Sequence, residues 1–145
     1  MAKVYASAVI PAPASEVWAI VRDFNALPKW TKFVAESRIE HNAPSDKVGC
    51  VRNLRLTNGG RVRERLLALS DYEMSCVYSI LESPMGVENY VATLRLIPVT
   101  EDDHAFAEWS AEFDAAPERE DALVEDIGRN VFAAGLGALK TRFSR

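Results

Sequence analysis

Six consecutive segments between residues 32 and 113 alternate apolar and polar side chains, and short turns separate them. Alternation with a period of two is typical of strands that bury one face. The gaps contain turn-forming residues, as in Asn58-Gly59-Gly60 and Ser83-Pro84-Met85-Gly86. Short turns join antiparallel neighbours, so an antiparallel meander is predicted. Its strands are Lys32 to Glu40, Val48 to Leu56, Arg61 to Leu69, Met74 to Leu81, Asn89 to Ile97 and His104 to Phe113.

The segments on either side of this meander complete the predicted fold. Val4 to Ile10 alternates as a further strand, and Ser15 to Phe24 has apolar residues at helical spacing. Asn25 to Trp30 is predicted as a second short helical turn. Pro117 to Phe143 is predicted as one long helix, with acidic residues near its start and basic residues near its end. The chain is therefore expected to be a single α+β domain over residues 1–145, with a curved seven-stranded antiparallel sheet wrapped around a long C-terminal helix and two short helices between the first and second strands.

Composition argues against several classes of partner. The chain has 145 residues, a net charge of −4 and a pI of about 5.2, whereas nonspecific nucleic-acid binding requires a basic surface. No apolar run approaches the roughly 20 residues that span a bilayer, so no stable membrane insertion is expected. The two cysteines are not in a metal-binding motif, and no cofactor fingerprint is present. We expect a cytoplasmic protein without metal or cofactor, either a monomer or a homodimer.

Alternation also assigns the inner face of the sheet, and two charged residues fall on it. Arg52 shares a face with Leu54 and Leu56, and Glu64 shares one with Val62, Leu66 and Ala68. A three-residue loop at Asn58 to Gly60 would place Leu56 opposite Val62 and Leu54 opposite Glu64, so that Arg52 and Glu64 are diagonal neighbours. An isolated buried charge is too costly to keep. The two residues are therefore predicted either to form an ion pair or to face a wet cavity.

The predicted C-terminal helix favours a cavity. Its sheet-facing residues become small towards the C-terminal half and would fill less of a concave sheet than Leu or Phe. These residues are Leu123, Ile127, Val131, Ala134, Gly135 and Ala138.

Several short motifs, in this order, resemble the START-like, helix-grip superfamily, which includes the birch-pollen-allergen fold, bacterial polyketide cyclase/dehydrase and lipid-transport proteins, and plant abscisic acid receptors. The resemblance covers essentially the whole chain and implies a ligand cavity between the sheet and the C-terminal helix, gated by loops. The motifs are Ala12-Pro13-Ala14-Ser15-Glu16-Val17-Trp18, Leu27-Pro28-Lys29-Trp30, Val48-Gly49-Cys50-Val51-Arg52, Arg63-Glu64-Arg65-Leu66, Asn89-Tyr90, Trp109 and Gly135-Leu136 with Leu139.

The resemblance to the abscisic acid receptors is local. The residues that match Glu64 and Tyr90 line the receptor pocket and join a water network. The receptor lysine that grips the hormone carboxylate falls at Ala35, and the gate and latch motifs are replaced by Thr57-Asn58-Gly59-Gly60 and Gly86-Val87-Glu88. This chain is therefore not expected to be an abscisic acid receptor, and its ligand need not be a carboxylate.

Two main hypotheses for function follow. The first is a carrier or sensor that binds a hydrophobic or amphipathic small molecule (lipid, isoprenoid, aromatic or polyketide-like). The second is a polyketide cyclase/aromatase-type or hydratase enzyme, with Glu64 as general acid or base and Tyr90 or Tyr78 beside a developing enolate. A protein-binding adaptor is a third alternative. The residues predicted at the ligand site are Arg52, Leu54, Leu56, Val62, Glu64, Leu66, Tyr78, Ile80, Tyr90, Ala92, Trp109, Ile127, Val131 and Gly135.

Each polar candidate also has a structural explanation. Arg52 and Glu64 can be an ion pair without a catalytic task. Tyr78 and Tyr90 can bind a ligand through their hydroxyl groups or pack in the wall. Met85 can cap the mouth of a cavity or lie in an exposed turn. These alternatives remain open at the level of sequence.

Overall fold

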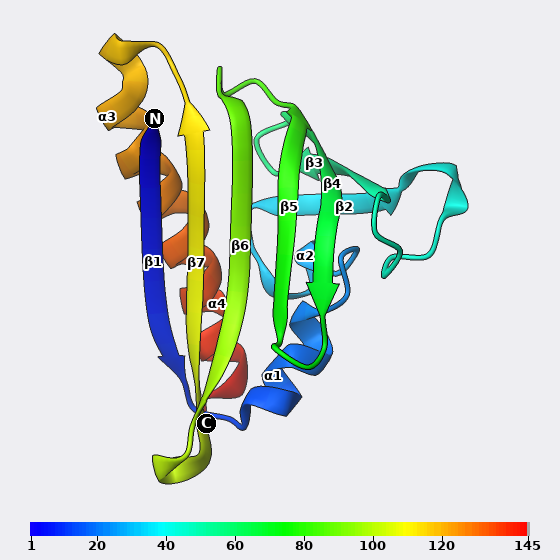
Figure 1. The fold of residues 1–145 in the computed structure, drawn as a ribbon, viewed down its shortest axis with the longest axis vertical. Coiled ribbons are helices and arrows are strands. Elements are labelled where there is room, and N and C mark those ends of the chain that lie inside the picture. Colours follow the sequence, from blue (N-terminus) through cyan, green and yellow to red (C-terminus); the bar gives the residue numbers. More distant parts are fainter. Residues whose placement is uncertain (145) are drawn as a thin grey trace.

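The computed structural model describes residues 1–144, which contain a curved, seven-stranded antiparallel sheet (Figure 1). The strand order is β1-β7-β6-β5-β4-β3-β2, so β2 to β7 form a meander and β1 pairs with β7 at one edge. The predicted fold class is confirmed. The strands are β1 (Ala2–Ile10), β2 (Val34–Ile39), β3 (Val51–Leu56), β4 (Arg61–Ser70), β5 (Ser75–Glu82), β6 (Glu88–Val99) and β7 (His104–Asp114).

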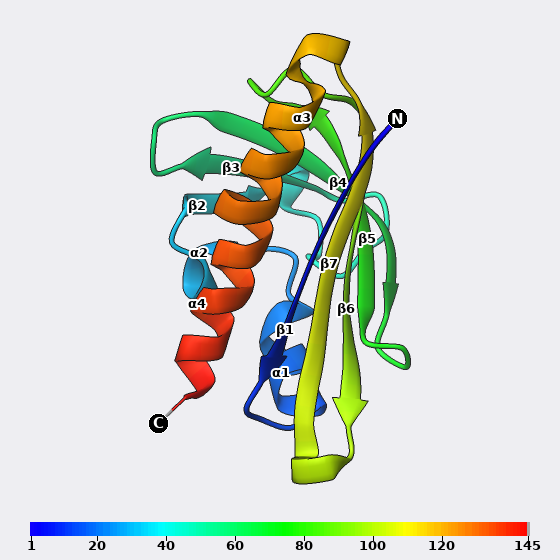
Figure 2. The same ribbon diagram turned by 90° about the vertical axis from the view of Figure 1, so that its left-hand side faces the viewer.

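The helices cover one face of this sheet. Two short helices, α1 (Ala14–Val21) and α2 (Leu27–Trp30), lie between β1 and β2 as predicted. The long C-terminal helix consists of α3 (Pro117–Asp126), a π-helical segment (Ile127–Ala133) and α4 (Ala134–Phe143). Figure 2 shows this helix running along the sheet, with α1 and α2 beside its C-terminal half. The sheet and the helices thus enclose a common interior.

The sheet curves strongly, so that β2 runs across the direction of β6 and β7 in Figure 1. One of its irregularities is a bulge in β4, where Leu66 pairs with Tyr78 but Ala68 pairs with Val77. The extra residue reverses the alternation beyond it. Ala68 is therefore exposed and Leu69 turns inward, which corrects the prediction that Ala68 shares the inner face.

The register of β3 and β4 differs from the predicted one. Arg52 lies directly opposite Glu64, and Leu54 lies opposite Val62. The three-residue loop comprises residues 57–59, because the amide of Leu56 donates to the carbonyl of Gly60. The predicted and observed registers differ by two positions, which leaves every side chain on the same face of the sheet. The inward direction of Arg52 and Glu64 is thus as predicted, whereas their diagonal placement is wrong.

The buried face of the C-terminal helix also departs from its prediction. Ala134 is exposed, whereas Phe132, Leu136 and Leu139 are fully buried. A π-helical turn contains more residues than an α-helical turn. The next fully buried residue after Ile127 is therefore Phe132, five positions later, rather than Val131, four positions later. These large side chains fill the space at the C-terminal half of the helix, where small residues were expected to leave it open.

Candidate functional site

A cavity of about 80 Å³ lies between the inner face of the sheet and the middle of the C-terminal helix. Its walls come from β2 to β7, from the α2 region and from the π-helical segment, and most of the surface is apolar. The polar groups on the wall belong to an arginine, a glutamate, two tyrosines and a tryptophan. The lining residues are Leu27, Phe33, Val34, Arg52, Leu54, Leu56, Val62, Glu64, Tyr78, Ile80, Met85, Tyr90, Trp109, Ile127 and Val131.

Most of the residues predicted at the ligand site lie on this wall, but three do not. Leu66 lines a smaller neighbouring cavity, because the curvature of β4 carries it past the main one. Ala92 pairs with Tyr78 across β5 and β6 and is fully buried. Gly135 lies against the indole of Trp109, one helical turn beyond the cavity. The predicted residues on the wall are Arg52, Leu54, Leu56, Val62, Glu64, Tyr78, Ile80, Tyr90, Trp109, Ile127 and Val131.

The cavity also includes residues that were not among those predicted at the ligand site. Leu27 and Val34 belong to elements that were predicted correctly. The apolar pattern of these elements indicated that both residues are buried, but not that they line a cavity. Phe33 lies in the link before β2. Met85 lies in the loop between β5 and β6, which supports the view that it caps the mouth over that of an exposed turn residue. No spacing rule identifies such contacts, because they depend on how a loop folds back over the sheet.

The Arg52–Glu64 ion pair is the electrostatic centre of the site. Nε of Arg52 donates to Oε1 of Glu64 at 2.8 Å, Nη2 forms an ion-pair contact with the same oxygen at 2.7 Å, and Nη1 donates to the carbonyl oxygen of Phe24 at 3.1 Å. The guanidinium carbon lies 3.9 Å from the ring centroid of Phe24 and 4.7 Å from that of Tyr78. The centroids of the two rings lie 6.2 Å from each other, so the rings flank the guanidinium on adjacent sides. The charge of Arg52 is thus paired with Glu64 inside the wall.

Glu64 is only half engaged by this pair. Its side chain is buried, and burial raises the pKa of the carboxyl group, while the adjacent Arg52 opposes this rise. Oε1 accepts the hydrogen bond from Nε of Arg52 and contacts Nη2, whereas Oε2 has no hydrogen-bond partner within residues 1–144. Among these residues, Trp30 Nε1 is the only enclosed side-chain polar atom left without a partner. Glu64 Oε2 is therefore open to the cavity rather than sealed in the wall.

The two tyrosines of the wall differ in their hydrogen bonding. The hydroxyl oxygen of Tyr78 accepts a hydrogen bond from Nε1 of Trp109 at 3.1 Å. The hydroxyl of Tyr90 has no protein partner within the described chain, while its ring stacks on Phe113 with centroids 5.7 Å apart. Burial raises the pKa of both phenols, so both remain protonated at neutral pH. Tyr90 thus presents a free hydroxyl group to the cavity from a fixed ring.

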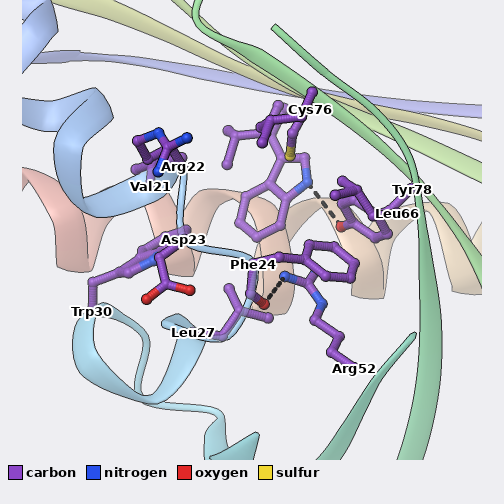
Figure 3. A pocket seen from close by; sticks show the side chains of 13 residues that line it. Val21, Arg22, Asp23, Phe24, Leu27, Trp30, Arg52, Leu66, Cys76 and Tyr78 are labelled. Carbon is purple, nitrogen blue, oxygen red and sulfur yellow. Dashed lines mark hydrogen bonds between the residues drawn. The ribbon is translucent and has the colours of Figure 1, made fainter. Parts of the chain in front are cut away.

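A second, much smaller cavity of about 10 Å³ lies deeper in the interior, towards α1 (Figure 3). Its volume suits a single water molecule. The figure shows the hydrogen bonds from Arg52 to Phe24 and from Trp109 to Tyr78 at its rim. Four residues line both cavities and separate them, namely Leu27, Arg52, Tyr78 and Trp109.

Other kinds of site find no support in residues 1–144. No group of three or more His, Cys, Asp or Glu residues in this range is placed to hold a metal ion. None of the helices in the same range combines the length and the apolar character needed to cross a membrane. Cys50 and Cys76 are buried free thiols, and burial raises the pKa of both.

Comparison with solved structures supports the fold assignment. A protein from Thermobifida fusca is 32% identical, with a TM-score of 0.88 over 99% of this chain and 93% of that one. The protein XoxI from Bacillus cereus is 29% identical, with a TM-score of 0.87 over 99% of this chain and 96% of that one. A norcoclaurine synthase point mutant from Thalictrum flavum, solved with a transition-state analogue, shares the fold at 17% identity, with a TM-score of 0.75 over 97% and 92% of the two chains.

Among curated proteins, no sequence matches this chain. The family described as polyketide cyclase / dehydrase and lipid transport matches residues 1–144, which is nearly the full length of the sequence. The helices, the sheet and the enclosed cavity agree with this match. The chain therefore belongs to the polyketide cyclase / dehydrase and lipid transport family.

Proposed function

We propose that this protein binds a small, mainly apolar molecule in the cavity between the sheet and the C-terminal helix, as a carrier or a sensor. The supporting observation is the cavity itself, with an apolar wall and few polar groups, among them the open carboxylate oxygen of Glu64. Pockets for small molecules have this composition, because apolar burial supplies the affinity and a few polar groups set the orientation. The family description, which includes lipid transport, agrees with this role.

The volume of the cavity limits what fits without movement. About 80 Å³ is well below the roughly 300 Å³ at which ligand pockets for larger compounds begin. A ligand of about one ring is closest to this size, and a longer one requires the wall to move. Met85 and the loop around it are the movable part of the wall, because Met85 is half-buried and flanked by Gly86 at a positive φ of 76°.

The experiment is native mass spectrometry of the purified protein, combined with an NMR titration with toluene. We expect either a co-purified small molecule or saturable shifts of amides around the cavity. Val131→Phe, on the helix side of the wall, should abolish binding by filling the cavity. Val91→Phe, on the exposed face of β6, adds the same group outside it and should leave binding unchanged. Equal binding by both variants would refute the proposal.

A second candidate function is acid–base chemistry on a bound molecule. It is favoured by one observation, namely that Glu64 combines a raised pKa with an oxygen open to the cavity. Glu64 would then transfer a proton, and the hydroxyl groups of Tyr78 or Tyr90 would stabilise an enolate. Glu64→Gln separates the two functions. Loss of turnover with unchanged binding supports the enzyme, whereas altered affinity, with no turnover in the wild type or the variant, supports the carrier or sensor.

A further inference from the structure

The polar groups still free on the cavity wall define the chemistry of the ligand. We infer that the cavity selects a neutral, hydroxyl-bearing ligand of about one ring, such as a phenol or a cyclic alcohol, and rejects carboxylates. This inference rests on the proposed binding function and extends it to a substrate class.

The first step of the argument concerns the positive charge. A carboxylate ligand needs a cation or several free donors, and among residues 1–144 the one cation on the wall is Arg52. Its charge is already paired with Glu64, through a hydrogen bond from Nε to Oε1 and a contact of Nη2 with the same oxygen, and Nη1 donates to the carbonyl oxygen of Phe24. An anion entering the cavity would therefore lose its water beside the negative charge of Glu64, which already neutralises this cation.

The second step concerns the free acceptor. Glu64 Oε2 is an acceptor with no protein donor in residues 1–144, so a bound molecule with an O–H group can supply the missing hydrogen bond. Hydrogen bonds to a charged acceptor are stronger than those between neutral groups. The ligand gains this bond only if it carries a donor.

The third step concerns the free hydroxyl of Tyr90. Glu64 pairs with Ile80 across β4 and β5, and Ser79 pairs with Val91 across β5 and β6, so Tyr90 follows Ile80 in the same cross-strand row. Its hydroxyl lies on the same cavity as Glu64 and can donate to a ligand oxygen. A hydroxyl group is both donor and acceptor, and it therefore matches a wall that offers a free acceptor on Glu64 and the phenolic donors of Tyr90 and Tyr78.

The remaining wall specifies an apolar body for the ligand. Leu54, Val62, Ile80, Ile127 and Val131 contribute only hydrocarbon. A second polar substituent on the ligand would be buried against these side chains without a partner, at a cost in free energy. One hydroxyl on an otherwise apolar ring can bond both Glu64 Oε2 and the hydroxyl of Tyr90.

The test compares three ring-sized probes of similar shape, namely phenol, toluene and benzoate, by NMR titration of the purified protein. Phenol should bind at least as tightly as toluene, although it is the more soluble in water, and benzoate should bind at least tenfold more weakly than phenol. Glu64→Gln should weaken phenol binding by about tenfold, the scale of one hydrogen bond to a charged group, and leave toluene binding unchanged. Glu112→Gln, on the exposed face of β7, is the matched control and should change neither.

The outcomes distinguish this inference from the proposed function. Binding of toluene with a tenfold preference over phenol, or binding of benzoate as tight as that of phenol, overturns the inference and leaves the cavity as a ligand site. Binding of none of the three probes overturns the proposed function and the inference together. If Glu64→Gln unfolds, the relative affinities of the wild-type protein for phenol, toluene and benzoate still test the inference. Tyr90→Phe is then the second variant, and it should weaken the binding of phenol but not that of toluene.

Discussion

Gly135 lies so close to Trp109 that a β-carbon at position 135 would stand 2.7 Å from Cζ3 of the indole. Gly135→Ala should therefore force the helix or the indole to shift, and we expect a loss of about 1–3 kcal/mol in the free energy of unfolding. Urea denaturation followed by tryptophan fluorescence measures this loss.

Gly137 provides the control in the same helix, because a β-carbon there would have no neighbour within 4 Å. Gly137→Ala should stabilise the protein by about 0.4–1 kcal/mol through the lower entropy of the unfolded chain. Similar effects of the two substitutions on the free energy of unfolding would show that the contact with Trp109 does not exclude a β-carbon at position 135.

The buried ion pair provides a second prediction. Arg52→Met removes the cationic partner that Glu64, a buried carboxylate, has within residues 1–144, and we expect a loss of about 3–5 kcal/mol at pH 7. Arg55→Met, which breaks the exposed pair with Glu36, should cost far less, because solvent screens this pair. Urea denaturation of both variants makes the comparison.

The double replacement of Arg52 by Met and Glu64 by Leu tests the same point from the other side. It removes both charges together and should recover most of the stability that Arg52→Met loses, because no unpaired charge remains buried. A double variant as unstable as the single one would show that packing of the arginine side chain, rather than charge pairing, carries the effect.

The two cavity tyrosines should differ in their contribution to stability. Tyr78→Phe leaves the N–H group of Trp109 buried without an acceptor, which should cost about 1–3 kcal/mol. Tyr90→Phe removes a hydroxyl that has no protein partner within residues 1–144 and should change stability by less than about 0.5 kcal/mol. Thermal unfolding monitored by circular dichroism distinguishes the two, and equal losses would place the hydroxyl of Tyr90 in a protein hydrogen bond.

Glu40 should determine part of the acid sensitivity. Both of its carboxylate oxygens accept hydrogen bonds from Arg63, at 2.7 and 2.9 Å, and these bonds lower its pKa from the usual 4.5 to about 2. A pKa lowered in the folded state stabilises the fold above about pH 4.5, and this contribution disappears as the pH falls towards 2. Glu40→Gln should therefore unfold more easily at pH 7 and lose less stability between pH 4.5 and 2, although solvent screening of the pair limits the size of the effect.

The comparison for this prediction is Glu36→Gln. Hydrogen bonding to Arg55 lowers the pKa of Glu36 as well, but the pair is exposed, so its contribution should be smaller. Denaturation curves between pH 2 and 7 report both variants. Parallel curves for Glu40→Gln and the wild type would contradict the assignment.

Alternation of side chains predicted most of this fold, and its limits have a physical origin. A strand pattern records only which face a residue occupies, so it placed Arg52 and Glu64 inward but could not separate two registers that differ by two positions. The bulge in β4 leaves no trace in composition, and Ala68 was therefore assigned to the wrong face.

The parts of the candidate site that lie on strands were predictable from the sequence. The parts that depend on the winding of the helix or on the conformation of loops were not. Ile127 and Val131 follow α-helical spacing and line the cavity as predicted, whereas Phe132 is buried only because the helix widens there. Met85 and Phe33 reach the cavity from segments between strands, whose conformation depends on the assembled protein.

The wide turn between Ile127 and Ala133 holds one residue more than α-helical winding needs for the same rotation. Each residue of an α-helix advances the side-chain direction by about 100°, and each residue of a π-helical turn advances it by less. Removing one residue from this segment would let it wind as an α-helix through nearly the same angle, so that α3 and α4 stayed seated and Gly135 still faced Trp109. Natural relatives or engineered variants that are one residue shorter here can therefore keep the contact between position 135 and the indole.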